Sequence, residues 1–170
     1  KVQPAQENGA SQVVISGHKP AVERAMALAK GKGCKLVKAL PVSAPFHSAL
    51  MDSAALQLAT ELAQVAVRSP RIPVVANIDA EPYPHGDAAA VRDRLVRQVA
   101  GTVRWEGCVQ RLVALGATAI IEVGPGKVLQ GLVKRIAPGV ALGGFSDPSG
   151  LAAISELSSS FTTLSQASLS

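Results

Sequence analysis

The sequence predicts an α/β protein with a largely parallel sheet, and two observations carry that prediction. Short runs rich in β-branched residues alternate along the chain with segments in which apolar residues recur every three or four positions, which is typical of strands joined by helices. The composition, 48% hydrophobic and 17% charged over 170 residues, is that of a folded globular chain. Because aromatic residues make up only 3%, we expect a core of Ala, Val, Leu and Ile.

The first forty residues predict a β-α-β unit. Residues 12–16 form a short β-branched run, and a further strand is expected near residues 1–4. Residues 21–30 place apolar side chains on one face of a helix, which Gly31 ends. Residues 35–40 alternate in polarity and are predicted to form the next strand.

Helices and strands continue to alternate along the rest of the chain. An amphipathic helix is predicted from Ala54 to Val65, and Asp87 is a suitable N-cap for a helix at 88–100. The other predicted helices are 105–115, 127–136 and 150–157, and the predicted strands are 73–78, 119–123 and 140–142. Open sheets of this class have about four to six strands, so we expect the missing strands to precede Lys1 in a longer parent chain.

The basic charge leaves several partners open. A formal net charge of +5 and a pI of about 9.6 would suit nucleic acid, an acidic protein or a phosphate-bearing cofactor. No aromatic residues are interleaved with the basic ones to stack bases, and the basic residues are scattered apart from one cluster, at Lys30, Lys32, Lys35 and Lys38. No apolar run reaches the roughly 18 residues that a membrane helix needs.

Metal-ligand spacing is not evident in the sequence. Cys34 and Cys108 are far apart and match no metal or redox motif, so we expect two buried free thiols. His18 and His85 fall in predicted turns and have no partner at metal-ligand spacing.

The segment from Pro41 to Met51 places His47 in a proline-fenced loop between a predicted strand and a predicted helix. A neutral imidazole can take a proton from a serine hydroxyl near neutral pH, which makes His47 a candidate general base. The alternative is a surface or helix-capping histidine. A base implies a nucleophile, but the sequence contains no Gly-x-Ser-x-Gly elbow, and Ser48 is not assigned because a residue adjacent to the base usually points elsewhere.

The turn Gly124-Pro125-Gly126 follows a predicted strand and precedes a predicted helix. Anions bind at such helix N-termini, but the spacing of a nucleotide phosphate loop is absent. A tight strand-to-helix turn and an anion site both remain open here.

From about Gln3 to Leu157 the chain resembles the C-terminal part of the malonyl-CoA:acyl-carrier-protein transacylases of bacterial fatty acid synthesis. Several motifs carry the resemblance in the family's order and spacing. They are QVVISGH at 12–18, PVSAPFHSALM at 41–51, PVVANID at 73–79, LVRQ at 95–98 with VRW at 103–105, and EVGPGKVL at 122–129.

The resemblance implies a partial parallel-sheet acyltransferase domain, hydrolase-like, joined to part of a ferredoxin-like subdomain. We expect residues 1–40 to form that partial ferredoxin-like β-α-β subdomain, 41–157 to form the C-terminal part of the acyltransferase domain, and the Ser/Thr-rich residues 158–170 to form a flexible tail. The implied reaction is a two-step malonyl transfer through an acyl-serine. Malonyl-CoA is then a substrate, and no cofactor or metal is permanently bound.

The resemblance also assigns individual residues. His47 matches the family's catalytic histidine, and Gln98 matches a glutamine whose backbone carbonyl accepts a hydrogen bond from that imidazole. Phe46 matches the malonyl-accepting members, whereas relatives that accept methylmalonyl groups tend to carry Ser there. Lys134 and Arg135 match a basic pair that faces the acidic carrier protein, for which ordinary solvated helix charges are the alternative.

The family's serine elbow, its carboxylate-binding arginine and its oxyanion-hole groups would all lie upstream of Lys1. The resemblance also implies what the parent protein does as a whole. It would be a discrete cytoplasmic enzyme that is monomeric when complete, binds acyl carrier protein, and has no nucleic-acid or membrane partner. An inactive fragment or a carrier-protein-binding module without a nucleophile is the competing hypothesis.

Overall fold

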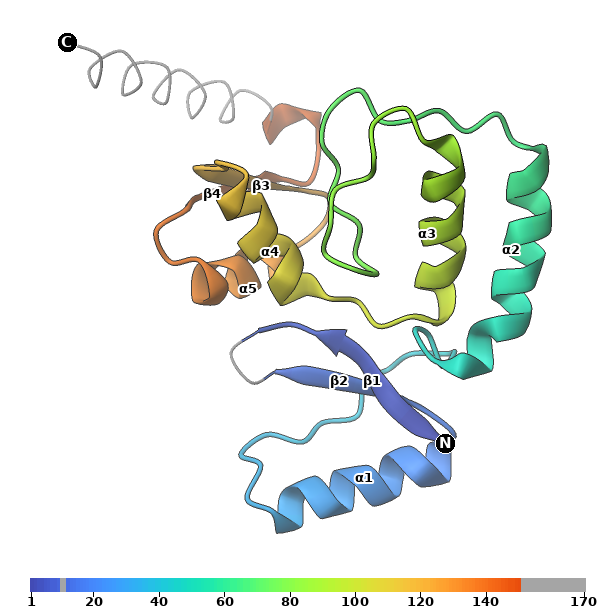
Figure 1. The fold of residues 1–170 in the computed structure, drawn as a ribbon. Helices are drawn as coiled ribbons and strands as arrows, with labels where there is room; N and C mark the ends of the chain where they lie inside the picture. The colour runs from blue at the N-terminus through green and yellow to red at the C-terminus, as the bar shows by residue number, and fades with distance from the viewer. Residues whose placement is uncertain (10–11, 151–170) are drawn as a thin grey trace. The chain divides into compact units, whose positions relative to one another are not determined.

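The computed structural model (Figure 1) describes residues 1–9 and 12–150. By its internal contacts the chain divides after Arg111 into two compact units. The first unit begins with an antiparallel hairpin of β1 (Val2–Glu7) and β2 (Val13–Gly17), followed by helix α1 (Lys19–Gly31). The predicted strand-to-helix step is confirmed, with Pro20 in the first turn of α1, where its missing N–H costs nothing.

The strand predicted at residues 35–40 does not form, so this prediction is wrong. The order is β1-β2-α1, and the segment after α1 has no regular structure. A strand needs a neighbour to pair its backbone groups. Within the described residues β1 pairs with β2 and, on its other side, forms an isolated bridge from Gln6 to Val103, and residues 35–40 pair with neither strand. The alternation that suggested a strand instead leaves Leu36 80% exposed.

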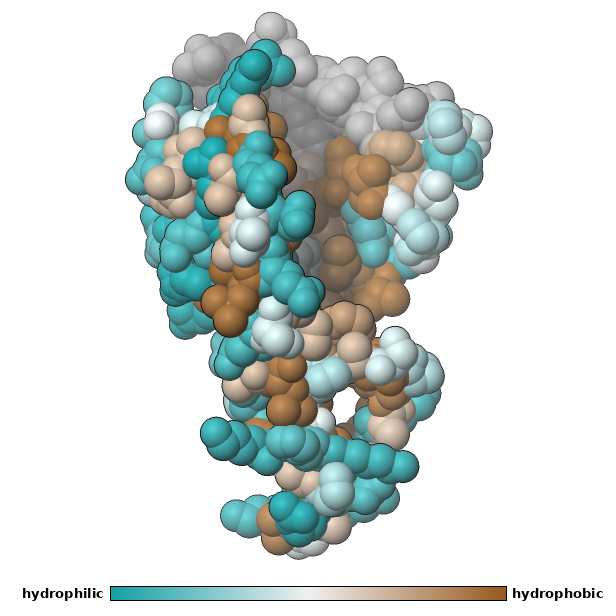
Figure 2. Space-filling view, turned by 90° about the vertical axis from the view of Figure 1, so that its right-hand side faces the viewer, coloured by the Kyte–Doolittle hydropathy of each residue, from teal (hydrophilic) through white to brown (hydrophobic). Residues whose placement is uncertain are grey.

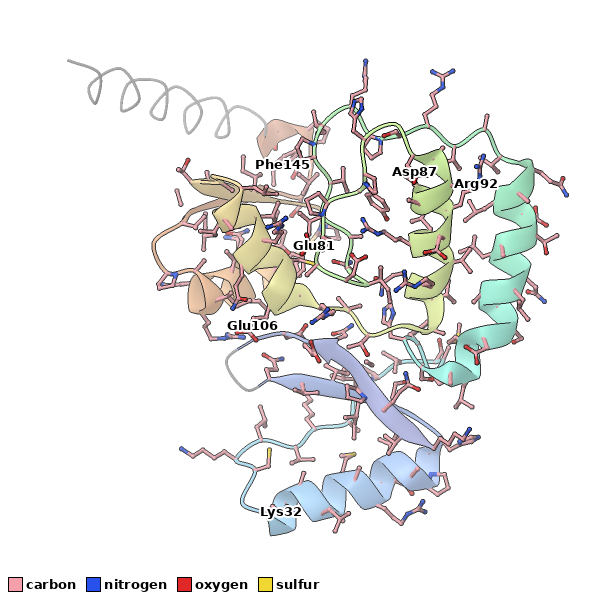
Figure 3. All side chains as sticks on the ribbon, in the orientation of Figure 1. Lys32, Glu81, Asp87, Arg92, Glu106 and Phe145 are labelled. Atoms are coloured by element: carbon pink, nitrogen blue, oxygen red, sulfur yellow. The ribbon has the colours of Figure 1, made fainter. Side chains whose placement is uncertain are left out.

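Three helices follow: α2 (Asp52–Gln64), after a short 3-10 turn at Ala49–Met51, α3 (Ala88–Ala100) and α4 (Trp105–Ala114). The boundary after Arg111 falls within α4, so its last turn belongs to the second unit. Asp87 caps α3 as predicted, because its Oδ1 accepts a hydrogen bond from Ala90 N at 2.8 Å. Arg92 of α3 reaches α2, where its guanidinium donates to Leu62 O and Val65 O at 3.0 and 2.9 Å (Figure 3). These bonds satisfy carbonyls at the C-terminal end of α2 and hold the two helices side by side.

The strand predicted at residues 73–78 is also wrong. Only Val75 is paired, in an isolated bridge to Pro82. The chain folds back on itself, with Ala80 N bonded to Ala76 O and Ala76 N bonded to Glu81 O, so the apolar run forms the arm of a tight loop. Residues of that loop are held by Arg94, which contacts Asp79 at 2.9 Å and the Pro82 carbonyl at 2.7 Å.

The second unit contains a parallel strand pair with a helix between its strands in sequence. Strand β3 (Ala119–Val123) pairs with β4 (Ala141–Phe145), and helix α5 (Val128–Ile136) connects them. This confirms the predicted strand, helix and strand, although β4 extends further than residues 140–142. A short 3-10 turn follows at Pro148–Gly150, whereas the predicted helix at 150–157 and tail at 158–170 fall outside the described residues apart from Gly150.

Buried hydrophobic side chains among the described residues are few and mostly small. They are Ala5, Ala21, Ala76, Val91, Cys108, Val109, Leu132 and Val133. Large apolar side chains are exposed in contrast, including Val42 at 63% and Leu56 at 71%, and Figure 2 shows hydrophobic surface interspersed with hydrophilic residues. Of the helices described, none combines the length and the apolar character needed to cross a membrane.

Candidate active site

The loop that carries His47 is bent tightly and anchored on both sides. His47 has a backbone φ of 57°, a left-handed conformation that few non-glycine residues adopt and that concentrates at functional sites. The next residue, Ser48, is 1% exposed and its hydroxyl donates to Pro45 O at 2.7 Å. Beyond it, Ala49 N donates to the side-chain Oε1 of Gln3 in β1 at 3.1 Å. The loop is thus closed internally and fixed to the hairpin.

The imidazole of His47 reaches the C-terminal end of α3. Its Nδ1 lies 3.0 Å from the backbone oxygen of Gln98. A carbonyl oxygen can only accept, so Nδ1 carries the proton in this contact, and Nε2 of the neutral ring keeps its lone pair. The contact that the family resemblance implies for these two residues is therefore formed.

Gln98 can offer its carbonyl because of its place in α3. The last four carbonyls of a helix have no intrahelical partner, and Gln98 lies in this last turn. Its side chain also serves the helix end, since Nε2 donates to Gly101 O at 3.2 Å. A Cβ on Gly101 would collide with the Ile78 side chain and lie 2.8 Å from Arg97 O, so a glycine is required where the chain leaves α3.

Strand β1 supports both parts of this site. The segment after α3 runs beside β1 (Figure 1): Thr102 Oγ1 donates to Pro4 O and Val103 N donates to Ala5 O, each at 2.8 Å. Gln3 of the same strand holds the His47 loop. Gln3 and Thr102 were not predicted from the sequence, because their partners lie 46 and 98 residues away and no short-range pattern links them.

The remaining candidate residues are exposed. Phe46, next to His47 in sequence, is 48% exposed. Lys134 and Arg135 are exposed in the last turn of α5, in the other unit. An open groove of about 540 Å³ lies between α2 and α3 with Leu56, Val96 and Gly101 in its lining, and neither His47 nor Gln98 lines it. The site is therefore defined by the His47 contact and not by this groove.

The turn at Gly124-Pro125-Gly126 is a structural turn. Gly124 and Gly126 have φ values of 132° and 95°, which favour glycine. Two of the N–H groups at the start of α5 are bonded within the chain, because the Glu122 carboxylate accepts from Leu129 N at 3.1 Å and from Gln130 N at 3.0 Å. A protein carboxylate thus fills the position that an external anion would take.

The two thiols differ, and the prediction that both are buried is wrong for Cys34. Cys34 is exposed in the irregular segment after α1, whereas Cys108 is buried in α4. Burial raises the pKa of the Cys108 thiol to about 11, with Asp79 adding to the shift. Within the described part of the chain, no three His, Cys, Asp or Glu side chains gather as a metal site would require.

Comparison with known proteins identifies the family that the chain resembles. Residues 1–139 match the family described as the acyl transferase domain. A malonyl CoA-acyl carrier protein transacylase of Escherichia coli K12 is 47% identical over 156 residues, covering 92% of this chain and 50% of the relative. A crystal structure of an acyl-carrier-protein S-malonyltransferase from Burkholderia pseudomallei is 47% identical, with a TM-score of 0.85 over 90% of this chain and 49% of its own.

A malonyl-transacylase solved in complex with its type II PKS acyl-carrier protein is 40% identical, with a TM-score of 0.84 over 89% of this chain and 48% of its own. The chain therefore belongs to the acyl transferase domain family. It spans about half the length of the curated relatives that it matches.

Proposed function

We propose that this chain is the histidine-bearing half of an enzyme that transfers a malonyl group from malonyl-CoA to the phosphopantetheine thiol of an acyl carrier protein. The observation that supports it best is the contact of His47 Nδ1 with Gln98 O at 3.0 Å, since it leaves Nε2 available as a base. We infer the malonyl group and the carrier protein as substrates from the names of the relatives, which are malonyl transacylases that act with an acyl carrier protein.

In the proposed first step, His47 Nε2 takes the hydroxyl proton of a serine while the serine oxygen attacks the malonyl thioester. The carbon–sulfur bond to CoA breaks, and the imidazolium returns the proton to the departing thiolate. In the second step Nε2 takes the proton of the phosphopantetheine thiol, whose sulfur attacks the acyl-serine, and the serine oxygen regains a proton as it leaves. The reaction needs no bound cofactor or metal.

The serine is assigned to the part of the relatives' length that this chain does not span, because the sequence has no Gly-x-Ser-x-Gly elbow. In the proposed enzyme, residues 1–40 contribute to a small ferredoxin-like subdomain and residues 41–157 contribute to the acyltransferase domain. The complete enzyme is proposed to be a cytoplasmic monomer.

Phe46 is proposed to favour malonyl over methylmalonyl groups. A bulky ring beside the base restricts the space around the acyl α-carbon, and one methyl group is worth about 1–3 kcal/mol of discrimination. The ring is half exposed in this chain, so its effect depends on the acyl group bound against it.

Lys134 and Arg135 are proposed to face the acidic carrier protein. Both lie exposed in one helical turn, and opposite charge steers association more than it adds affinity. Replacing both by Ala should raise KM for the carrier protein while leaving acylation by malonyl-CoA unchanged. The effect should shrink at high salt; an equal loss with both substrates would count against this assignment.

The function is tested with a hybrid in which the 156 aligned residues of this chain replace their counterpart in the Escherichia coli transacylase. We expect malonyl transfer to holo carrier protein. The 170-residue chain alone should form no malonyl adduct in intact-mass measurements, because it has no nucleophile elbow. A soluble, folded hybrid that transfers no malonyl group would favour the non-catalytic, carrier-binding alternative.

A further inference from the structure

The His47 loop has a side-chain contact with β1 that neither the family resemblance nor the proposed chemistry uses. Gln3, in β1, accepts a hydrogen bond from Ala49 N through Oε1 at 3.1 Å. Ala49 lies two residues after His47, directly beyond the buried Ser48. The bond therefore acts on the backbone that sets the direction of the imidazole.

The geometry of the loop makes this contact matter. His47 holds φ at 57°, a strained conformation that persists only where the surroundings enforce it. Ser48 fixes the loop internally, through its bond to Pro45 O. That bond moves with the loop and cannot set its position relative to α3.

The end of α3, which carries the hydrogen-bond partner of His47, is attached to the same strand. Gln98 O is the acceptor for the imidazole, and the segment leaving α3 is tied to β1 by Thr102 Oγ1 to Pro4 O and Val103 N to Ala5 O. Gln3, Pro4 and Ala5 are consecutive. One short stretch of β1 thus holds the loop with the base and the helix end with the acceptor.

We propose that Gln3 is a positioning residue: through Ala49 it fixes the His47 loop to β1 and keeps the imidazole in register with the Gln98 carbonyl. This inference rests on the proposed function for its kinetic consequence, but its structural consequence can be measured without any reaction. Losing the Gln3 acceptor frees the loop, and the Nδ1–H tautomer of His47 loses the contact that selects it.

The first test is the tautomer of His47 in the full 170-residue chain, labelled with ¹⁵N-histidine and observed by NMR at about pH 8.5, where unperturbed imidazoles are neutral. The unsubstituted chain should hold His47 with the proton on Nδ1. Gln3→Met removes the acceptor at similar volume and should give a mixture of tautomers, whereas Gln3→Glu keeps an acceptor oxygen and should retain the Nδ1–H form.

The controls separate positioning from folding. His18 and His85 report on the rest of the chain and should not change, and Gln57→Met on the exposed face of α2 should leave His47 as it was. A Gln3→Met chain that keeps a pure Nδ1–H tautomer at His47 overturns the proposal. A Gln3→Glu chain with the same mixture of His47 tautomers as the Gln3→Met chain also overturns it.

The second test uses the hybrid enzyme. Gln3→Met should lower kcat by about 10- to 100-fold, the scale of a small misplacement of a catalytic group, with KM for malonyl-CoA unchanged and Gln3→Glu restoring most of the rate. If the unsubstituted hybrid is inactive, the proposed function fails while the tautomer measurement still decides the role of Gln3. An unchanged kcat in an active hybrid contradicts the inference.

Discussion

At the scale of single residues, one hydrogen bond determines what His47 can do. Because the Gln98 carbonyl is an acceptor, it selects the tautomer with Nε2 unprotonated. In the proposed reaction this carbonyl takes the orienting part that a carboxylate takes in Ser-His-Asp triads. It belongs to the backbone, so the contact survives any substitution at Gln98 that leaves α3 intact.

The chemistry of this residue pair was predictable from sequence only through the family resemblance. His47 alone could equally have been a capping histidine, and nothing in the local pattern around Gln98 indicates a partner 51 residues away. Gln3 and Thr102 were not predicted at all. Their roles depend on long-range contacts to β1, which periodicity and motif spacing cannot reveal.

The two cysteines provide a prediction at this scale. Cys34 is exposed and Cys108 is buried with its pKa raised to about 11 from the usual 9.0. Maleimide or iodoacetamide at neutral pH should label Cys34 promptly and Cys108 only on unfolding, as read by peptide mass spectrometry. Equal labelling rates in the native chain would contradict the described burial.

The same pKa shift sets a pH dependence. A thiol whose pKa is raised by folding stabilises the folded chain fully below pH 9.0 and loses that contribution as the pH rises toward about 11. Cys108→Ala should therefore show a smaller loss of stability between these two pH values than the unsubstituted chain, measured by urea unfolding.

At the scale of elements, the helix ends organise the structure. The start of α3 is capped by Asp87, and at its end the Gln98 carbonyl accepts a hydrogen bond from His47 Nδ1. The start of α5 is capped by Glu122 from the preceding strand, because Lys127 at its N-cap position makes no side-chain cap. Sequence patterns identified these helices well, since their apolar periodicity and caps are local.

The strands were predicted less well, for a physical reason. Residues 35–40 and 73–78 both have strand-like composition, but a strand exists only when another strand pairs with it. Residues 119–123 pair with β4, whereas the segment at residues 73–78 folds back into a loop with its own neighbours in sequence. Pairing is a tertiary property and could not be judged from either segment alone.

Glu122 gives the prediction for an element. Glu122→Ala should remove the cap from two N–H groups of α5 and destabilise the helix start by about 1–2 kcal/mol, while Glu122→Gln should cost less because one acceptor oxygen remains. Hydrogen exchange at Leu129 and Gln130 measures this directly. The control is Glu61→Ala on α2. If Leu129 and Gln130 exchange no faster in Glu122→Ala than in this control, Glu122 does not cap α5.

At the scale of the whole chain, the buried hydrophobic set is small and the exposed one is large. Buried side chains among the described residues are mainly Ala and Val, while Leu36, Val42 and Leu56 are among the large side chains left exposed. We expect exposed large apolar side chains in this number to favour association with a partner or with a second copy of the chain. The family match over about half of the relatives' length is consistent with such a surface.

The 170-residue chain on its own should therefore bind the dye ANS and associate with rising concentration, as measured by fluorescence and by light scattering after gel filtration. Adding the part of the Escherichia coli relative that this chain does not match should reduce both signals. A chain that remains monomeric and does not increase ANS fluorescence at high concentration would show that its exposed apolar surface needs no partner.

The measurement that tests the central claim most directly is the single-turnover rate of acyl-serine formation in the hybrid, compared between His47→Ala and Gln98→Ala. If His47 is the base, its loss should slow acylation by roughly 10²- to 10⁴-fold. Gln98→Ala, which keeps the backbone carbonyl, should cost far less. Near-normal acylation by the His47→Ala hybrid, or equal losses in the two variants, would contradict the account.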